Sequence, residues 1–245
     1  MTFELCTLCY NYQRRWIWQL SSLVQQNYIP EDICISVGAI GDNGKPSTNE
    51  VIENFQGLHI KIIDYKSFDN FPVRGYIRDE QIKQSSADWL IFIDPDHILH
   101  PDFFKDVEAG IKKYGHLQRV FSIYEKVTTH KVVTQYMIDN QSDIYIKDAY
   151  RESLNIRKAE QQIQRRVAGG CLQIVNRKSI LELNDGKYTV EGKSRDRHLF
   201  KQKTPDDARF RRVLGGSCFF KGSNPLVHLN HYRVTDKQYN PESQK

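Results

Sequence analysis

Asp94 and Asp96, separated by one proline, directly follow the apolar run Trp-Leu-Ile-Phe-Ile at positions 89–93. An uninterrupted apolar run of this length is typical of a strand buried on both faces, as in a parallel sheet. Such sheets bind ligands at the carboxyl ends of their strands, and carboxylate oxygens are the ligands that hard divalent cations prefer. The position of the pair therefore predicts a cation site, and the bound cation could neutralise the charge of a leaving phosphate group. Because aspartate is also common in turns, a turn that caps the helix expected at 101–114 is the alternative.

His228 and His231 are a second pair of possible cation ligands. Their spacing of three residues lets both imidazoles share one face of a turn, and imidazole nitrogen suits manganese better than magnesium. If this turn folds back onto Asp96, the site would hold Mn2+ (or Mg2+) with mixed oxygen and nitrogen ligands. The alternative is a pair of hydrogen-bonded surface histidines.

The residues before Asp94 alternate between strand-like and helix-like patterns four times, with short connections between them. Strands are expected at 4–9, 33–40, 58–63 and 89–93, and helices at 11–26, 49–55 and 74–86. This alternation predicts an α/β fold with a mostly parallel sheet flanked by helices. The second half is less regular. It predicts a helix at 101–114, strands at 120–127 and 169–175, a polar helix-prone lobe or lid at 138–166, and a polar tail from 234 onward.

The five cysteines indicate buried, reduced thiols, because their number is odd and four of them lie in apolar runs. Cys6 and Cys9 have the spacing of a redox or zinc motif, but no second such pair exists. Period-2 strand geometry also places the two side chains on opposite faces of the sheet. Reduced thiols, the absence of a long apolar stretch and the absence of a secretory leader pattern together predict a cytoplasmic protein without a transmembrane segment.

Positive charge is concentrated in the second half of the chain. The formal net charge is +5, and residues 147–212 hold 17 basic and 9 acidic side chains. Such an excess suits a polyanionic partner, either a diphosphate or a nucleic acid. The alternative is an ordinary solvated basic surface.

Several of these segments resemble family 2 glycosyltransferases. Cys9-Tyr-Asn-Tyr12 and the helix after it resemble the opening of that family. Residues 74–80 resemble one of its helices, with Arg78 in the place of the family's arginine and Asp79 in the place of its usual asparagine. Residues 87–96 resemble the strand that ends in the family's Asp-x-Asp motif. The likeness is good over residues 3–105 and patchier beyond them.

The resemblance implies a single GT-A domain over residues 1–245, with a Rossmann-like sheet. Within it, 1–105 would be the half that binds a nucleotide sugar and 106–233 the acceptor-side half, with a helical, basic lobe around 138–166 and a tail at 234–245. The donor contacts that we expect from it are Thr7, Tyr10, Asn11, Arg14, Arg15, Asp42, Arg78, Asp94 and Gly170. The family's aspartate after the second strand is replaced by Gly38-Ala39, so Asp42 or Asp64 would have to read the base or ribose.

The resemblance also implies a general base and a cation shell. Residues 192–199 fall where the family has a Glu-Asp pair, and Asp196 matches the aspartate that serves as base, while Arg195 replaces the glutamate. Asp206, Asp207 and Glu191 remain alternative bases. The motif His228-Leu-Asn-His231 resembles that of a branch with galactosyl- and chondroitin-type transferases. There it completes the cation shell, which here would comprise Asp94, Asp96, His228 and His231.

The implied activity is a metal-dependent, inverting transfer of a sugar from a nucleotide diphosphate sugar, UDP-linked by resemblance, to a hydroxyl. The acceptor would be a glycan or lipid-linked sugar, or a hydroxymethylated base in DNA. One alternative is a nucleotidyltransferase, although the Gly-rich phosphate loop usual after the first strand is missing from Tyr10-Asn-Tyr-Gln13. The other is an inactive binding module, which the exchanges at Asp79 and Arg195 would favour.

Overall fold

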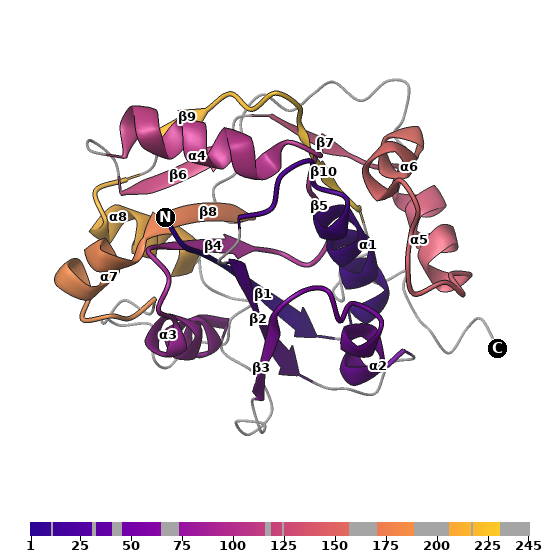
Figure 1. Ribbon diagram of the computed structural model, residues 1–245, viewed down its shortest axis with the longest axis horizontal. Coiled ribbons are helices and arrows are strands. Elements are labelled where there is room, and N and C mark those ends of the chain that lie inside the picture. Colours follow the sequence, from indigo (N-terminus) through magenta and orange to yellow (C-terminus); the bar gives the residue numbers. More distant parts are fainter. Residues whose placement is uncertain are drawn as a thin grey trace.

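A seven-stranded sheet with the order β3-β2-β1-β4-β8-β6-β9 forms the centre of the molecule (Figure 1). The computed structural model describes residues 1–10, 12–30, 33–40, 46–64, 74–115, 119–123, 125–156, 171–188, 206–216 and 218–230. The strands are β1 Phe3–Tyr10, β2 Ile33–Ile40, β3 Ile60–Asp64, β4 Trp89–Ile93, β5 His97–Ile98, β6 Val120–Ile123, β7 Lys126–Thr128, β8 Leu172–Asn176, β9 Cys218–Phe220 and β10 Leu226–His228. The helices are α1 Gln13–Val24, α2 Thr48–Glu53, α3 Arg74–Gln84, α4 Phe103–Tyr114, α5 Lys131–Asp139, α6 Ala149–Asn155, α7 Arg177–Leu183 and α8 Asp206–Val213.

The first four strands form the parallel half of the sheet. β1 pairs in parallel with β2 and β4, and β2 pairs in parallel with β3. This confirms the alternation expected from the sequence: β2 and β4 have the expected bounds, and the other elements of this half begin and end within two residues of theirs. The signal was strongest where β2 and β4 are largely apolar runs and α1 carries its apolar residues at helical spacing.

The two faces of the sheet are covered by different helices and bury different side chains. One core contains Phe3, Leu5 and Cys9 of β1 with Trp16 of α1, and a second core contains Cys6 with residues of α3 and α7. Cys6 and Cys9 therefore lie on opposite faces, as the strand period predicts, and both are buried cysteines that form no disulfide. Burial raises the pKa of the Cys6 thiol well above its ordinary value, with a further contribution from the carboxylate of Glu4. This thiol is held in its neutral form.

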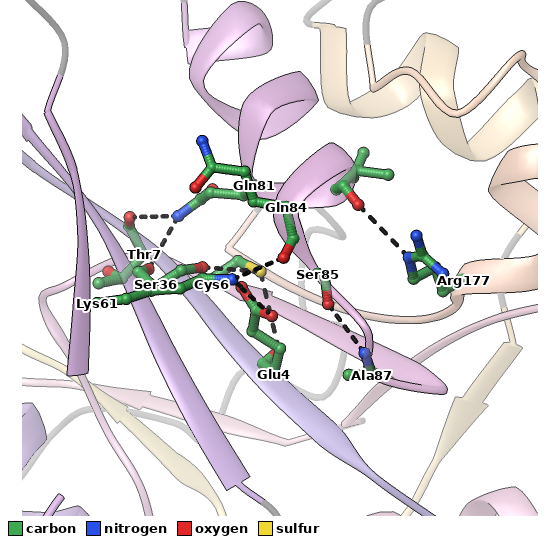
Figure 2. Close-up of polar contacts among 11 residues, drawn as sticks. Glu4, Cys6, Thr7, Ser36, Lys61, Gln81, Gln84, Ser85, Ala87 and Arg177 are labelled. Atoms are coloured by element: carbon green, nitrogen blue, oxygen red, sulfur yellow. Dashed lines mark hydrogen bonds and ion pairs between the residues drawn. The ribbon is translucent and has the colours of Figure 1, made fainter. Parts of the chain in front are cut away.

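Polar side chains also join α3 to the sheet (Figure 2). The amide of Gln81 donates to the backbone oxygens of Thr7 (3.0 Å) and Ser36 (2.8 Å), which belong to neighbouring strands. Lys61 Nζ lies 3.0 Å from the buried carboxylate of Glu4. A buried charge of this kind needs such a partner, because an isolated one would be costly to remove from water. The two bonds of Gln81 fix how α3 lies on β1 and β2, and the pair of Lys61 with Glu4 joins β3 to β1.

The second half of the main sheet contains an antiparallel strand and departs from the strand expected at 120–127. β8 runs antiparallel to β4 and β6. The single strand expected at 120–127 is wrong, because β6 joins the main sheet whereas β7 joins a second sheet with the order β5-β10-β7. The hydrophobic pattern shows that both segments are extended, but it carries no information about which sheet a strand joins.

Part of the segment expected as a polar surface lobe contributes to a core. Ile138, Ala149 and Ile156 are buried and pack in a cluster with Trp18 of α1 and Val227 of β10. Figure 1 shows α5 and α6 beside α1, on the side away from the main sheet. Arg14 Nη1 donates to the oxygens of Ile138 and Asp139 at the end of α5, both at 2.8 Å. Helix α5 was not expected from the sequence. Its side chains Val132, Val133 and Tyr136 are exposed, and Ile138 is its buried apolar residue.

No helix in the described part of the chain combines the length and the apolar character that spanning a membrane requires.

Candidate active site

Asp94 and Asp96 lie in a tight turn that follows β4. The backbone N–H of His97 donates to the oxygen of Asp94 (3.2 Å), which closes the turn, and the N–H of Asp94 donates to the oxygen of Cys171 (3.2 Å) before β8. The turn then leads into the short strand β5. The two carboxylates are therefore at the carboxyl end of a central strand, where sheets of this type bind ligands.

Helix α1 and Gln26, which follows its end, hold this turn through a row of polar side chains spaced as on one helix face. Gln19 is fully buried, and its Nε2 donates to the backbone oxygens of Asp94 (2.9 Å) and His97 (3.0 Å). Ser22 Oγ accepts the N–H of Leu99, and Gln26 Nε2 donates to the oxygen of His100. Because a buried backbone group without a partner costs free energy, this row stabilises one path of the chain through the site.

Asp96 lies between two imidazoles. Its Oδ1 is 2.8 Å from His97 Nδ1, and its Oδ2 is 3.4 Å from His228 Nε2. The two rings are stacked, with centroids 4.9 Å apart and an angle of 25° between their planes. His228 arrives on β10, which pairs antiparallel with β5, and the N–H of Leu229 donates to the oxygen of Asp96. The structure thus brings the chain near its C-terminal end back onto Asp96, while His231 lies outside the described residues.

The pKa values of His97 and His228 are shifted in opposite directions. Burial alone lowers the pKa of His97, but the neighbouring Cys171 and Asp96 outweigh burial and raise it to about 10. Burial lowers the pKa of His228 below its ordinary value, against the opposing effect of Asp96. Near neutral pH, His97 is therefore a charged partner of Asp96, whereas His228 is neutral and has a lone pair available for a cation.

The donor atoms fit a divalent cation. Asp94, Asp96 and His97 lie close together, with one possible ligand atom of each within 4.8 Å of the others. Because His97 is charged near neutral pH, it serves as the partner of Asp96 and the two carboxylates are the ligands in this group. Asp96 is 5% exposed, so both its oxygens are sheltered from bulk water. Two carboxylates and the neutral imidazole of His228 suit Mn2+ or Mg2+. His97 was missed as a site residue, although its place directly after Asp96 was a signal that could have found it.

The arginines expected at the donor have protein partners. Arg78 is fully buried on α3, with its Nη2 3.8 Å from Asp94 Oδ1. Arg14 binds the end of α5, where a cation is favoured by the helix dipole. Arg15 Nη2 donates to Gln135 Oε1 at 2.8 Å, and its guanidinium lies over the ring of Tyr12. Contact of Arg14 and Arg15 with a donor stays a prediction, whereas Arg78 is too deeply buried to offer a donor much surface.

The other expected donor and base residues are divided between the core and the parts of the chain that the structure does not describe. Thr7 is fully buried within β1, and its Oγ1 has no hydrogen-bond partner among the described residues. Tyr10 ends β1 beside Ile40 of β2. Asp206 and Asp207 begin α8, but their side chains are not described. The residues outside the described part of the chain are Asn11, Asp42, Gly170, Glu191, Asp196 and His231.

Comparison with known proteins defines the fold. No family model and no curated protein matches the sequence. Among solved structures, residues 1–349 of S. aureus TarS in complex with UDP-GlcNAc are 16% identical, with a TM-score of 0.61, and the match covers 98% of this chain and 62% of that chain. The mannosyltransferase PcManGT from Pyrobaculum calidifontis, in complex with GDP-Man and Mn2+, is 13% identical, with a TM-score of 0.54, and the match covers 97% of this chain and 58% of that one.

These matches show that the chain has the GT-A fold of nucleotide-sugar-dependent glycosyltransferases, in agreement with the fold expected from the sequence. At such identities the likeness concerns the fold. The chain spans about three fifths of the length of the matched structures.

Proposed function

We propose that this protein is a metal-dependent glycosyltransferase that uses a nucleotide diphosphate sugar. The observation that carries the proposal is the closeness of Asp94 and Asp96 at the end of β4 in a GT-A fold, with His228 Nε2 3.4 Å from Asp96 Oδ2. Two carboxylates beside a neutral imidazole are a donor set for a divalent cation that binds a diphosphate. Bound Mn2+ and GDP-Man in PcManGT support the same use of this fold.

Each residue would have a separate role. Asp96 and His228, completed by His231, would hold the cation, and Asp94 would reach the ribose or the cation through a water. When bound, the cation would neutralise charge on the departing diphosphate. Asp196 would take the proton of an acceptor hydroxyl, and that oxygen would attack the anomeric carbon opposite the leaving group, which inverts the configuration. Tyr10, Asn11, Asp42 and Gly170 are the further donor contacts that we propose.

Asp196 can be tested as the base separately from binding. Asp196→Asn should lower turnover by about a hundredfold or more, the usual share of a general base, and leave donor affinity nearly unchanged. Parallel measurements of kcat and of donor binding would separate the two effects. Normal turnover in this variant would move the role to Asp206, Asp207 or Glu191.

The donor would be a UDP-sugar, which the UDP-GlcNAc complex of TarS supports. The acceptor would be a hydroxyl of a glycan or lipid-linked sugar, or of a hydroxymethylated base in DNA. The basic excess in residues 147–212 keeps DNA as a candidate. Retention on duplex DNA that falls steeply with salt would favour DNA, because phosphate contacts release bound counterions.

One experiment separates the proposal from its rivals. UDP-GlcNAc, UDP-glucose and GDP-mannose are each added with Mn2+, with Mg2+ or with a chelator, and the melting temperature is measured. A true donor at a hundred times its Kd should stabilise the fold by about 2.7 kcal/mol, only in the presence of cation. The absence of any cation-dependent shift across a wider panel of donors would contradict the proposal. Binding without release of sugar would indicate an inactive module, and release of pyrophosphate from a nucleoside triphosphate would indicate a nucleotidyltransferase.

A further inference from the structure

Arg78 is a buried cation next to the first aspartate of the candidate site. The side chain of Arg78 is 1% exposed, and its guanidinium carbon lies 5.3 Å from the centre of the Phe92 ring and 4.5 Å from that of Tyr188. Two aromatic faces compensate part of the cost of removing a guanidinium from water, and a nearby anion compensates more. The carboxylate of Asp94 provides such an anion, 3.8 Å from Arg78 Nη2.

Tyr188 fixes the direction in which this guanidinium points. Arg78 Nη1 donates to Tyr188 Oη, and the backbone N–H of Tyr188 donates to Oδ1 of Asp79, one residue after Arg78 on α3. Gln173 Nε2 of β8 donates to the same Tyr188 Oη at 3.1 Å. The ring of Tyr188 also stacks on Phe210 of α8, with centroids 4.1 Å apart. Because contacts with α3, β8 and α8 all hold Tyr188, the guanidinium is fixed by a rigid frame.

Asp94 lies between this frame and the candidate cation site. Its backbone is fixed by Gln19 and by the oxygen of Cys171, whereas its side chain is 25% exposed. One of its oxygens also lies within 4.8 Å of possible ligand atoms of Asp96 and His97. The orientation of the carboxylate is therefore the remaining freedom of this residue, and Arg78 is a buried cation that lies against it.

We propose that Arg78 is a positioning residue that orients the Asp94 carboxylate toward the donor, and that Arg78 itself does not touch the donor. This inference rests on the proposed function, since it assigns Asp94 a contact with the donor. It differs from the direct phosphate or base contact expected from the sequence. A guanidinium that is 1% exposed and enclosed by two rings has almost no surface for a ligand. Its Nη1 is bonded to Tyr188 Oη, and its Nη2 faces a single oxygen of the Asp94 carboxylate.

A double-mutant cycle distinguishes action through Asp94 from direct contact. The wild type, Arg78→Met, Asp94→Ala and the double variant are titrated with UDP and with GDP, each with Mn2+, by calorimetry. Arg78→Met should weaken nucleotide binding by about tenfold, within the range of coupled neighbours, and should cause no further loss when Asp94 is already alanine. Losses that multiply in the double variant would overturn the proposal, because they would mean that Arg78 contacts the nucleotide itself.

Arg177→Met is the matched control. Arg177 Nε also binds α3, but at the oxygen of Ile82 (3.4 Å), close to the C-terminal end of the helix (Figure 2). This variant should bind nucleotide like the wild type. An equal loss in Arg177→Met and Arg78→Met would mean that both act by loosening α3, which contradicts a specific role for Arg78.

Two further measurements keep the inference testable if Arg78→Met folds poorly or if the wild type binds neither nucleotide. Tyr188→Phe keeps the guanidinium but removes its hydroxyl partner, so it should weaken binding less than Arg78→Met and only when Asp94 is present. Urea unfolding of the four proteins of the cycle measures the pairing without nucleotide. Failure of the wild type to bind any nucleotide would contradict the proposed function, whereas strictly additive shifts of the urea midpoint would contradict the pairing of Arg78 with Asp94.

Discussion

Asp96 is the side chain on which the proposed chemistry depends most directly. It is 5% exposed, and its two oxygens face two different imidazoles. A buried carboxylate of this kind is stable because His97, whose pKa is raised to about 10, provides a positive partner. The same carboxylate is available to a cation on the side of His228. The role of Asp96 thus follows from its partners rather than from its presence in an Asp-x-Asp triplet.

Asp96→Asn should abolish cation-dependent donor binding and leave the fold intact. Asparagine has nearly the same shape but no charge, so it keeps the packing and loses the preferred ligand of a hard cation. Loss of the charged partner of His97 should lower the free energy of unfolding by about 1–3 kcal/mol. Calorimetric titration with Mn2+ and nucleotide checks the first effect, and urea unfolding checks the second.

Asp102→Asn is the control for that prediction. Asp102 is a nearby carboxylate that pairs with Lys105 at the surface, outside the site. It should bind Mn2+ and nucleotide like the wild type. Unchanged cation dependence in Asp96→Asn would show that the cation, if one binds, is held elsewhere.

We expect the affinity for Mn2+ to depend on pH through His228. Burial lowers its pKa below the ordinary value of 6.5, and imidazole must be neutral to bind a cation. Affinity for Mn2+ should therefore be constant near neutral pH and should fall as the pH decreases below 6.5, through the lowered pKa. His228→Ala should bind Mn2+ more weakly at neutral pH and lose this part of the pH dependence. His231→Ala, measured in parallel, tests whether the second histidine acts in the same way.

If these histidines serve only in packing, their replacement should cause no more than a small change in stability. A Mn2+ titration at pH 5.5, 6.5 and 7.5 distinguishes packing from cation binding for each variant. Curves that match the wild type at every pH would show that His228 packs against Asp96 without binding the cation.

At the scale of elements, α1 determines how the turn that contains Asp94 and Asp96 is held. Gln19 of α1 and the nearby Gln26 donate hydrogen bonds to backbone oxygens between Asp94 and His100. A helix from the start of the chain is thereby held against the segment that follows β4. Gln19 and Gln26 have the same chemistry on the same face of this segment. Gln19 bonds to the turn that contains both aspartates and Gln26 bonds beyond it, so the two glutamines can be compared directly.

Gln19→Leu should weaken Mn2+ binding by about tenfold or more, because two backbone oxygens of the turn would lose their donor and the two carboxylates would no longer be held in place. Both variants should lower the free energy of unfolding by about 1–3 kcal/mol, but Gln26→Leu should change the Mn2+ affinity little. Thermal unfolding and calorimetry on both variants give the two quantities. Equal losses of affinity in the two variants would contradict a specific role of Gln19 in the site.

At the scale of the whole molecule, His100 connects distant parts of the chain. It is fully buried, with its Nε2 3.3 Å from Asp106 Oδ2 of α4. The same oxygen accepts the N–H (2.5 Å) and the hydroxyl (2.9 Å) of Ser223, shortly before β10. This contact joins the segment after the turn of Asp94 and Asp96 to the segment that carries His228.

Burial lowers the pKa of His100 below 6.5, and the carboxylates of Asp106 and Asp102 oppose this only in part. The unfolded chain then binds a proton more readily than the folded one, so stability should be full above pH 6.5 and should decrease as the pH falls below it. Each such group contributes a slope of up to about 1.4 kcal/mol per pH unit. His228 adds to the same slope, whereas His97, with its raised pKa, is protonated in both states there.

His100→Gln should therefore reduce the loss of stability between pH 6.5 and 5, at some cost in stability at pH 7. Urea unfolding of the wild type and the variant at pH 5, 6 and 7 measures both effects. Parallel profiles for the two proteins would assign the acid sensitivity to other groups.

The sequence by itself determined the parallel half of the fold and the position of the aspartate pair. Apolar runs and helical spacing are local patterns, so they gave β2 and β4 their bounds and placed Asp94 and Asp96 after a buried strand. The opposite directions of the Cys6 and Cys9 side chains followed from the strand period in the same way. Each of these features depends only on residues close together in the chain.

Only the tertiary structure decided which residues surround that pair. The pairing of β10 with β5 brings His228 to Asp96, and the packing of Tyr188 against Phe92 of β4 encloses Arg78 of α3 between the two rings. The division of residues 120–128 between two sheets also depends on distant partners. The physical reason is the same throughout. Strand register and the burial of a charged side chain are set by contacts between segments far apart in the sequence, and no local pattern carries that information.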